Sequence, residues 1–350
     1  MKKSILLLCV VALMALPVSQ VLAFHDGGVA ACGRCHTMHN SEDGTAIDPD
    51  HPLGNQYLLV EATPSDVCLT CHSTSRGAVW SGNLVTPSFR PGGDFTFLTE
   101  DNINDGHGGA TNPIDGDKAG HNVIAPSKNS GVDPFLTVGP GGNFPSAILS
   151  CTSCHDPHGN DHFRLLNGAG PVQDGIYTFT NAAPTAVAQS YNTNEDNTHH
   201  TAYQAGMSAW CANCHGDYHQ AGNGHLIHPS GATLGGTIAL AYGLYNGTDD
   251  PTGGDAATSY LGVVPFEDPA NTTTSTAGPT ASSQVSCITC HRAHASSGPN
   301  IGRWDFALTF LAEDGHESGS FALPNPYTIN QRSLCNKCHV KDTDNAPFEP

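Results

Sequence analysis

Six Cys-x-x-Cys-His motifs, a low content of apolar residues and frequent glycine and proline together predict a multihaem cytochrome c fold. We expect a chain that is mostly coil, with short helices and little strand, and whose core is a stack of haems. The six motifs occupy residues 32–36, 68–72, 151–155, 211–215, 287–291 and 335–339.

Each motif has the spacing that attaches a c-type haem. Two thiols three positions apart can bind the two vinyl groups of one porphyrin, and the adjacent histidine then lies beneath the ring as the proximal iron ligand. A single motif could also be a zinc or thiol redox site, but six motifs use twelve of the thirteen cysteines. We therefore expect six c-type haems. Their covalent attachment points are Cys32, Cys35, Cys68, Cys71, Cys151, Cys154, Cys211, Cys214, Cys287, Cys290, Cys335 and Cys338, and their proximal ligands are His36, His72, His155, His215, His291 and His339.

Residues 1–23 have the organisation of a secretory signal peptide. Lys2 and Lys3 form its basic region, residues 5–16 its apolar stretch, and residues 21–23 a cleavage site of relaxed type. The remaining cysteine, Cys9, lies in the apolar stretch and would be removed. No later segment has the roughly 18 apolar residues that a spanning helix requires. We expect residues 24–350 to form one hexahaem domain that is exported through the periplasm, does not span a membrane, and is extracellular or at the cell surface.

Composition explains why we expect coil. Apolar residues make up 38% and charged residues 13% of the chain, against about 45–50% and about 25% in ordinary globular domains. The 39 glycines and 24 prolines interrupt most candidate helices. Such a composition is by itself typical of a loop-rich or disordered chain. Six porphyrins would supply the missing apolar surface, so we expect short helices at the motifs, one of them opening near residues 207–210, joined by long coils.

The charge of the chain limits the classes of partner that it can bind. The formal net charge is −19, which makes nucleic acid and anionic membranes poor partners. Metal oxides and basic patches on redox proteins are better ones. Acidity alone does not establish this, because it also keeps exported proteins soluble.

The iron ligands determine the chemistry. Beyond the signal peptide the chain has only two methionines, Met38 and Met207, whereas fourteen of its twenty histidines lie outside the motifs. Six haems with histidine on both faces are therefore easily supplied. Such iron is saturated and suited to electron transfer, and its reduction potential is low because methionine ligation is what raises it.

A second histidine follows the proximal one by three residues at three motifs, and by four residues at another. On a helix such pairs lie on one face, whereas the two axial ligands of one iron must approach from opposite faces. Each second histidine would then serve a different haem, which predicts closely packed haems. Alternatively, some of them are surface residues or partners of haem propionates. The four second histidines are His39, His158, His219 and His294.

Outside the motifs, the chain resembles the OmcS-like family of extracellular hexahaem c-type cytochromes, whose subunits polymerise into filaments known as cytochrome nanowires. The similarity covers the whole chain after the signal peptide, in the same order and with the same number of motifs. The matching elements are residues 24–30 (Phe-His-Asp-Gly-Gly-Val-Ala), 36–41 (His-Thr-Met-His-Asn-Ser), 91–95, 120–122, 154–159, 206–215, 291–296 and 331–339.

The resemblance implies a head-to-tail polymer with one continuous stack of bis-histidine haems. It implies that one haem takes its distal ligand from the neighbouring subunit, with His39 as the donor and the haem at His291 of the next subunit as its target. Seven distal candidates then compete for six places, so one is surplus. These candidates are His25, His39, His121, His158, His219, His228 and His294.

The expected function is extracellular electron transfer by hopping along six haems, toward acceptors such as metal oxides, redox partner proteins or partner cells. We expect an electron-transfer protein rather than an enzyme, with no catalytic side chain. One alternative is a periplasmic or surface electron shuttle that does not polymerise and satisfies every haem within one chain. Another is a multihaem reductase with one open iron, although its usual mark, a replaced proximal histidine, is absent.

Overall fold

The computed structural model describes residues 32–73, 78–81, 90–100, 103–104, 113–114, 118–189, 194–219, 230–247, 250–274, 279–314, 317–318, 321–323 and 325–339. The expected signal peptide, residues 1–23, and two distal candidates, His25 and His228, lie outside these residues. Within them most of the chain is coil between short helices and very short strands, which confirms the predicted fold class.

The helices are mostly a single turn long. The α-helices are α2 (Pro64–His72), α3 (Cys151–Cys154), α4 (Met207–Cys211), α5 (Gly235–Leu244), α6 (Ala256–Ser259), α7 (Cys287–Cys290) and α8 (Cys335–Cys338). The 3-10 helices are η1 (Cys32–Arg34), η2 (Gln56–Leu58), η3 (Phe95–Thr99), η5 (Pro126–Lys128), η6 (Ser146–Ile148), η7 (Phe163–Leu165), η8 (Gln173–Gly175), η9 (Gly216–His219), η10 (Pro299–Ile301) and η11 (Leu311–Glu313).

The described strands form five separate two-stranded antiparallel ladders, and none of these joins into a larger sheet. They pair β1 (Ser41–Glu42) with β2 (Thr45–Ala46), β3 (Ile103–Asn104) with β4 (Pro113–Ile114), β5 (Gly170–Val172) with β6 (Tyr177–Phe179), β7 (Thr185–Val187) with β8 (Ala202–Ala205), and β9 (Glu317–Ser318) with β10 (Phe321–Ala322).

Every described motif begins on a helical turn, and local sequence explains the start of these turns. In α2, Thr63 accepts a hydrogen bond from the Asp66 N–H, and Pro64 occupies the first helical position. In α3 the Ser153 hydroxyl accepts the N–H of Ser150 at 2.9 Å. The same capping pattern recurs in α7 between the Ser286 N–H and the Thr289 hydroxyl. Short polar side chains next to the cysteines therefore nucleate the turns.

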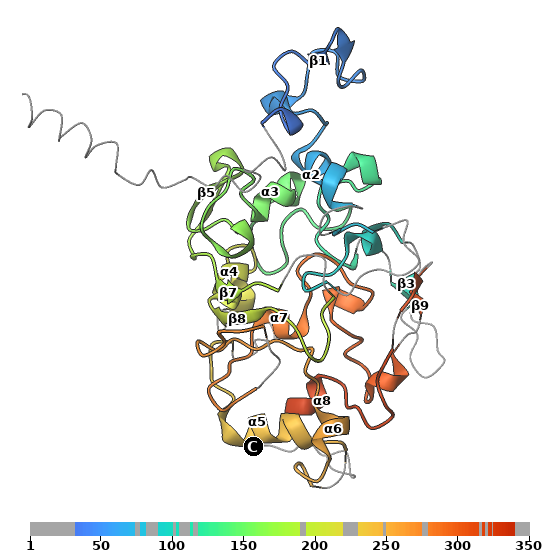
Figure 1. Cartoon of the computed structure of the whole chain (residues 1–350), viewed down its shortest axis with the longest axis vertical. Helices are drawn as coiled ribbons and strands as arrows, with labels where there is room; N and C mark the ends of the chain where they lie inside the picture. The colour runs from blue at the N-terminus through green and yellow to red at the C-terminus, as the bar shows by residue number, and fades with distance from the viewer. Residues whose placement is uncertain are drawn as a thin grey trace, which may run out of the picture.

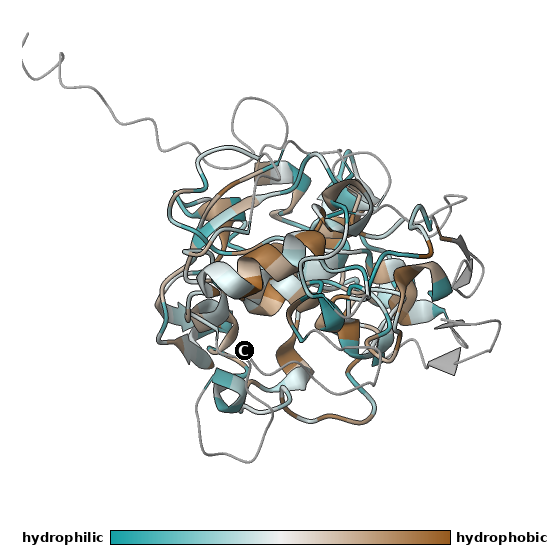
Figure 2. Ribbon diagram, turned by 90° about the horizontal axis from the view of Figure 1, so that it is seen from below, coloured by the Kyte–Doolittle hydropathy of each residue, from teal (hydrophilic) through white to brown (hydrophobic). Residues whose placement is uncertain are grey.

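The motif-bearing turns follow one another along the long axis of the molecule (Figure 1). The segment carrying η1 and β1 projects at one end, α2 and α3 lie below it, α4 and α7 lie in the middle, and α8 lies beside α5 and α6 at the opposite end. Seen along this axis, hydrophobic residues concentrate on the central helices while hydrophilic residues occupy the surrounding loops (Figure 2). The chain thus spaces its six attachment turns from end to end.

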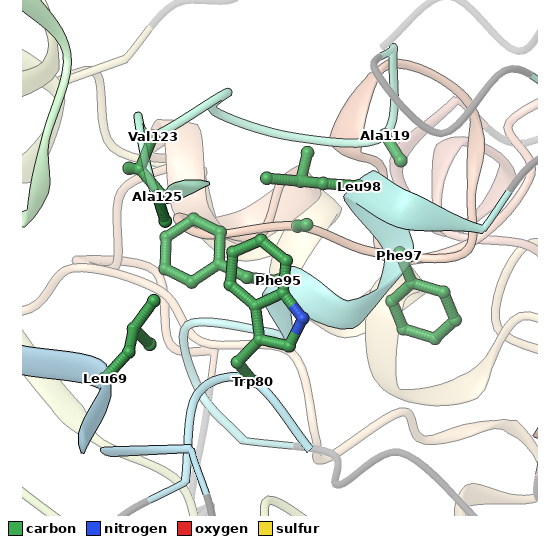
Figure 3. Packing of buried hydrophobic residues seen from close by; sticks show 9 residues of the cluster. Leu69, Trp80, Phe95, Phe97, Leu98, Ala119, Val123 and Ala125 are labelled. Atoms are coloured by element: carbon green, nitrogen blue, oxygen red, sulfur yellow. The ribbon is translucent and has the colours of Figure 1, made fainter. Parts of the chain in front are cut away.

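Two apolar clusters hold this arrangement together. In the first, Trp80 stacks on Phe95 with ring centroids 5.8 Å apart, as Figure 3 shows, and Leu69 of α2 packs nearby. The second surrounds α5 and α8, where the Tyr242 hydroxyl donates to the Leu261 carbonyl at 2.6 Å. The sequence did not predict α5, because its glycines and uniformly apolar residues give no amphipathic pattern.

Asp94 is a buried polar side chain next to Phe95 of the first cluster, and we predict that its removal destabilises the fold. It is fully buried and accepts hydrogen bonds from the Ser81 N–H and hydroxyl and from the Thr96 N–H. Asp94→Ala should lower the free energy of unfolding by about 3 kcal/mol, because buried donors lose their acceptor. Denaturant unfolding of the haem-loaded protein measures this.

The matched control is Asp255→Ala, which removes an exposed cap that accepts from the Ala257 N–H. It should cost about 1 kcal/mol. Equal losses for the two variants would contradict the role of Asp94.

Candidate haem sites

Three proximal histidines face a second histidine from a distant part of the chain. The ring of His36 lies parallel to that of His158, with centroids 6.2 Å apart and an interplanar angle of 10°. The rings of His155 and His294 are 6.4 Å apart, and those of His215 and His121 are 5.8 Å apart.

These separations suit a metal ion between the rings. A bond of about 2 Å from each imidazole nitrogen to one ion places the two ring centres roughly 6 Å apart. Each pair belongs to a different Cys-x-x-Cys motif, so the thiols that would attach a porphyrin lie next to the pair. The residues present therefore fit a c-type haem with histidine on both faces of the iron.

Backbone carbonyls fix the orientation of the proximal rings. The Nδ1 atom of His36 lies 2.9 Å from the Tyr57 oxygen, and that of His155 lies 2.9 Å from the Arg164 oxygen. His215 bonds in the same way to the Pro140 oxygen at 2.8 Å and His291 to the Asn300 oxygen at 3.0 Å. An Nδ1–H donor to a carbonyl leaves Nε2 as the unprotonated atom, which is the form that binds iron.

The motifs at His36, His155 and His291 share one backbone design. After each, the chain returns in a tight turn whose central residue has a positive φ: Tyr57 at 57°, Arg164 at 51° and Asn300 at 53°. That central residue supplies the carbonyl to the histidine. The residue two positions later forms an antiparallel bridge with the same histidine, pairing His36 with Leu59, His155 with Leu166 and His291 with Gly302.

The surroundings of two partly buried distal candidates favour their neutral form. Burial and the nearby His215 lower the pKa of His121 to about 4, and burial and the nearby His155 lower the pKa of His294 to about 3. A neutral imidazole is the ligand-competent form. The Phe95 ring stacks on His294 with centroids 4.6 Å apart, and a Cβ at Gly92 would lie 2.9 Å from the same ring. Phe95 and Gly92 therefore restrict the His294 ring from two sides.

Neighbouring motifs lie close to one another in chain order. The Cys68 and Cys151 thiols are hydrogen-bonded, as are those of Cys211 and Cys287. At the other three junctions the cysteines lie close enough for their charges to interact. Cys35 lies near Cys68 and Cys71, Cys154 near Cys211 and Cys214, and Cys290 near Cys335 and Cys338. The six motifs therefore form one file in which each motif lies close to the next.

The first-to-first contacts are built alike. The Ser65 hydroxyl, three residues before Cys68, accepts the Cys151 N–H at 3.2 Å. The Ser208 hydroxyl, three residues before Cys211, accepts the Cys287 N–H at 3.1 Å. Helix α2 thereby packs on α3, and α4 packs on α7, with the same polar contact at the start of the second helix.

Comparison with known proteins agrees with this geometry. A family model described as a doubled CXXCH motif matches residues 145–173, which include the motif at residues 151–155. C-type cytochrome OmcS of Geobacter sulfurreducens is 34% identical, over 98% of this chain and 99% of its own length. The chain belongs to the OmcS family of c-type cytochromes. Its Cys-x-x-Cys-His motifs accordingly bind c-type haem.

Solved structures extend the similarity to the fold. The outer membrane cytochrome S filament from Geobacter sulfurreducens has a TM-score of 0.73 and 32% identity, covering 91% of this chain and all of that one. The OmcS nanowires from the same organism, determined by cryo-electron microscopy, have a TM-score of 0.71 and 31% identity with the same coverage.

The expectation that His155 and His291 each share a helix with the histidine three residues later is wrong for this OmcS family member. The structure ends α3 at Cys154 and α7 at Cys290, and both proximal histidines are extended, with φ of −116° and −112°. The turn ends because the histidine must reach the carbonyl of the following turn. The second histidines nevertheless face other motifs: His158 faces His36, and His294 faces His155.

The remaining candidates have different surroundings. His39 is exposed, and no hydrogen bond or ring contact of its side chain is recorded within the described ranges. His219 ends η9, and its Nδ1 lies 3.2 Å from the Ser230 hydroxyl. Of the other proximal candidates, His72 ends α2, and His291 and His339 directly follow α7 and α8. His25 and His228 lie outside the described residues.

Sequence reasoning missed the atoms that orient the ligands, because they are backbone carbonyls. The turns that supply them have two successive residues with positive φ, as in Arg164-Leu165 and Asn300-Ile301. Leu166 and Gly302, which follow these pairs, then bridge back to the motif histidines. It also missed Glu195, whose partners lie far away in the chain.

The close approach of the turn at residues 139–142 to the fourth motif gives a prediction. A Cβ at Gly142 would lie 1.8 Å from the Cys214 oxygen, so Gly142→Ala must push this turn and its Pro140 carbonyl away from His215. We expect the free energy of unfolding to fall by about 1–3 kcal/mol. Gly131→Ala, where a Cβ meets nothing within 4 Å, is the control and should be neutral. Identical denaturation midpoints would refute the close packing.

Proposed function

We propose that this protein is an extracellular electron conduit, in which subunits polymerise head to tail and electrons hop along six bis-histidine c-type haems per subunit. The observation that carries the proposal is the single file of six motifs, in which every motif lies close to the next one in chain order. A file of this kind suits transport along the molecule better than chemistry at one pocket.

The two ends of the file are open, which supports polymerisation. All six first cysteines lie within the described residues, and those of the terminal motifs, Cys32 and Cys335, are the exposed ones. Inside the chain, first cysteines meet in pairs. The same succession continued into a second copy would place the motif at Cys335 of one subunit beside the motif at Cys32 of the next. Such a head-to-tail contact does not close on itself, and it therefore generates a filament.

We assign the axial ligands from the opposed rings. His36 pairs with His158, His155 with His294, and His215 with His121. The remaining proximal ligands His72, His291 and His339 then draw on the candidates His25, His39, His219 and His228. Exposed His39 lies in the projecting N-terminal segment, so it is suited to reach the haem at His291 of the next subunit.

The haems would supply one-electron exchange at iron, and the protein supplies everything else. Imidazoles on both faces leave no position for a substrate. The carbonyls that accept from Nδ1 orient the proximal rings and raise their basicity, which favours a low potential. No side chain is required to make or break a bond, so the protein acts as an electron carrier and not as an enzyme.

The composition of the chain and the names of its relatives support an extracellular location. None of the helices described is both long enough and apolar enough to cross a membrane. The formal charge of −19 suits acceptors that are cationic, such as metal oxides or basic patches on redox proteins. The names of the relatives describe an outer membrane cytochrome filament and nanowires, and we extend this assembly and its extracellular position to the present chain.

The first test concerns a distal ligand within one subunit. His158→Ala should convert one of six low-spin haems to high spin, because His36 alone would then bind that iron. Electron paramagnetic resonance of the oxidised protein measures this. His162→Ala is the control, since the His162 Nδ1 bonds to the Leu166 oxygen and its ring faces no proximal histidine among those described. Six low-spin haems in His158→Ala would reject the assignment.

The second test concerns the polymer. His39→Ala should retain six covalently attached haems but lose filaments, because it removes a ligand shared between subunits. Cryo-electron microscopy of the extracellular haem-containing fraction measures assembly. His51→Ala, in the same segment and with a side chain that bonds to nearby Asp48, should form normal filaments. Normal filaments of His39→Ala would reject the shared ligand, and discrete particles of the unaltered protein would make it a diffusible carrier.

A further inference from the structure

A buried carboxylate lies at the junction of the fourth and fifth motifs. The Glu267 side chain accepts the Met207 N–H at 2.5 Å, at the start of helix α4, which ends at Cys211. Its charge also acts on the Cys287 thiol at the start of α7, and this thiol is hydrogen-bonded to that of Cys211. Helices α4 and α7 lie side by side in the middle of the molecule (Figure 1). Glu267 is therefore close to the attachment points of two successive haems.

The backbone fixes the position of this carboxylate. Glu267 and Gln284 form an isolated antiparallel bridge, with N–H to carbonyl hydrogen bonds of 3.0 Å and 2.8 Å. Gln284 comes three residues before Cys287. Glu267 is 4% exposed, so its carboxyl is largely removed from water but not sealed from it. A group held in this way can respond to a change of charge at either attachment point without moving.

The charge of Glu267 has little compensation from the protein. Buried Glu195, by comparison, accepts from Arg303 Nη1 at 2.7 Å and from Arg292 Nη1. For Glu267 no ion pair is recorded among the described residues, and one backbone N–H is the donor to its carboxyl. Burial raises the pKa of Glu267 above its ordinary value, and the hydrogen bond from Met207 offsets this only in part. The desolvation of an unpaired charge thus favours uptake of a proton.

The titratable groups on the elements around Glu267 do not compete for this proton. They are Cys211 on α4, Cys287 on α7, Tyr203 on β8 and Asp268, the next residue along the chain. Attachment of haem converts both thiols to uncharged thioethers. Burial raises the pKa of Tyr203 to about 12, so Tyr203 stays protonated. Burial would also raise the pKa of Asp268, but hydrogen bonds from the Ala270 N–H and from three hydroxyl groups lower it, so Asp268 stays charged.

We propose that Glu267 is a redox-linked proton site, which binds one proton when one of the two neighbouring haems is reduced. The proposal rests on the proposed haem array, because the haems at Cys211 and Cys287 supply the charge that changes. One electron, delivered along the array, converts ferric to ferrous iron. One proton from water bonds to a carboxylate oxygen of Glu267 and gives a neutral carboxylic acid. The net charge at the junction is then the same before and after the electron arrives.

Electrostatics determines the direction of this coupling. Reduction removes one positive charge near Glu267, so the carboxylate becomes less stable and its pKa rises further. Conversely, ionised Glu267 favours the oxidised haem, whereas protonated Glu267 does not. The potential at this junction should therefore fall as pH rises through the range between the pKa values of the oxidised and reduced states. One junction of the array would then respond to pH.

The test is a potentiometric titration of the haem-loaded full-length protein between about pH 5 and about pH 8, a range that lies above the ordinary carboxyl pKa. Glu267→Gln keeps an oxygen that accepts the Met207 N–H but loses the charge and the proton. In the unaltered protein one component should fall by about 59 mV as pH rises, which is a tenfold change in the ratio of oxidised to reduced haem. In Glu267→Gln this component should be independent of pH and should match the unaltered protein at acid pH.

Glu313→Gln is the matched control. Glu313 is exposed, and its carboxylate likewise accepts one backbone N–H, that of Phe310, at 3.4 Å. Its replacement should leave the pH dependence unchanged. Infrared difference spectra between the oxidised and reduced protein give a second measurement. A carboxylic acid band should appear on reduction of the unaltered protein and should be absent from Glu267→Gln.

Three results would overturn the proposal. Equal pH dependence in Glu267→Gln and the unaltered protein would place the proton elsewhere. A displacement of the same size at every pH would make Glu267 a fixed charge, and the absence of any displacement would make it only a cap of α4. Filaments whose titration does not depend on pH reject the proton site alone, whereas a pH-dependent component that Glu267→Gln removes, in a protein without filaments, rejects the polymer alone.

Discussion

The opposed pair of imidazoles is the constraint on which the rest of the structure depends. An iron bound by histidine on both faces requires two chain segments to meet at a fixed separation, which is near 6 Å between ring centres at His36 and His158. Segments that are distant in sequence must then be held without long helices or sheets. The described capped turns, the carbonyls that accept from Nδ1 and the glycines that allow close approach all act at these meeting points. A loop-rich chain becomes ordered because ligation replaces much of the usual apolar core.

Repetition of a few local designs builds the file of sites. The turn with a positive φ recurs after three motifs, and the serine contact between consecutive helices recurs twice. Each design costs some backbone strain or a buried hydroxyl, and each is compensated by a hydrogen bond to a motif residue. The turn carbonyl accepts from the histidine Nδ1, and the serine hydroxyl accepts from a cysteine N–H. Since odd and even motifs use different designs, the file has a direction. A directional array with different surfaces at its two ends is what a head-to-tail polymer requires.

The sequence predicted the parts of this structure that are local. Attachment motifs, coil content and the absence of long helices follow from spacing and composition within a few residues. The helical reading of Cys-His-x-x-His was wrong at His155 and His291, because a carbonyl from the following turn competes with the helix for the histidine. Helix α5 lacks the amphipathic pattern that would have revealed it. The cluster of Glu195 with Arg292 and Arg303 depends on segments that only the fold brings together, and no local pattern encodes it.

The net negative charge of the chain opposes assembly mainly at long range. Copies that each carry a formal charge of −19 repel one another, but salt screens this repulsion over about 8–10 Å. Association therefore needs contacts that act at short range. The projecting segment carries exposed Met38 and Leu53, and α5 at the opposite end carries exposed Leu240. Apolar contact, together with the coordinate bond that we propose for His39, would act within a few ångströms, where long-range repulsion no longer determines the outcome.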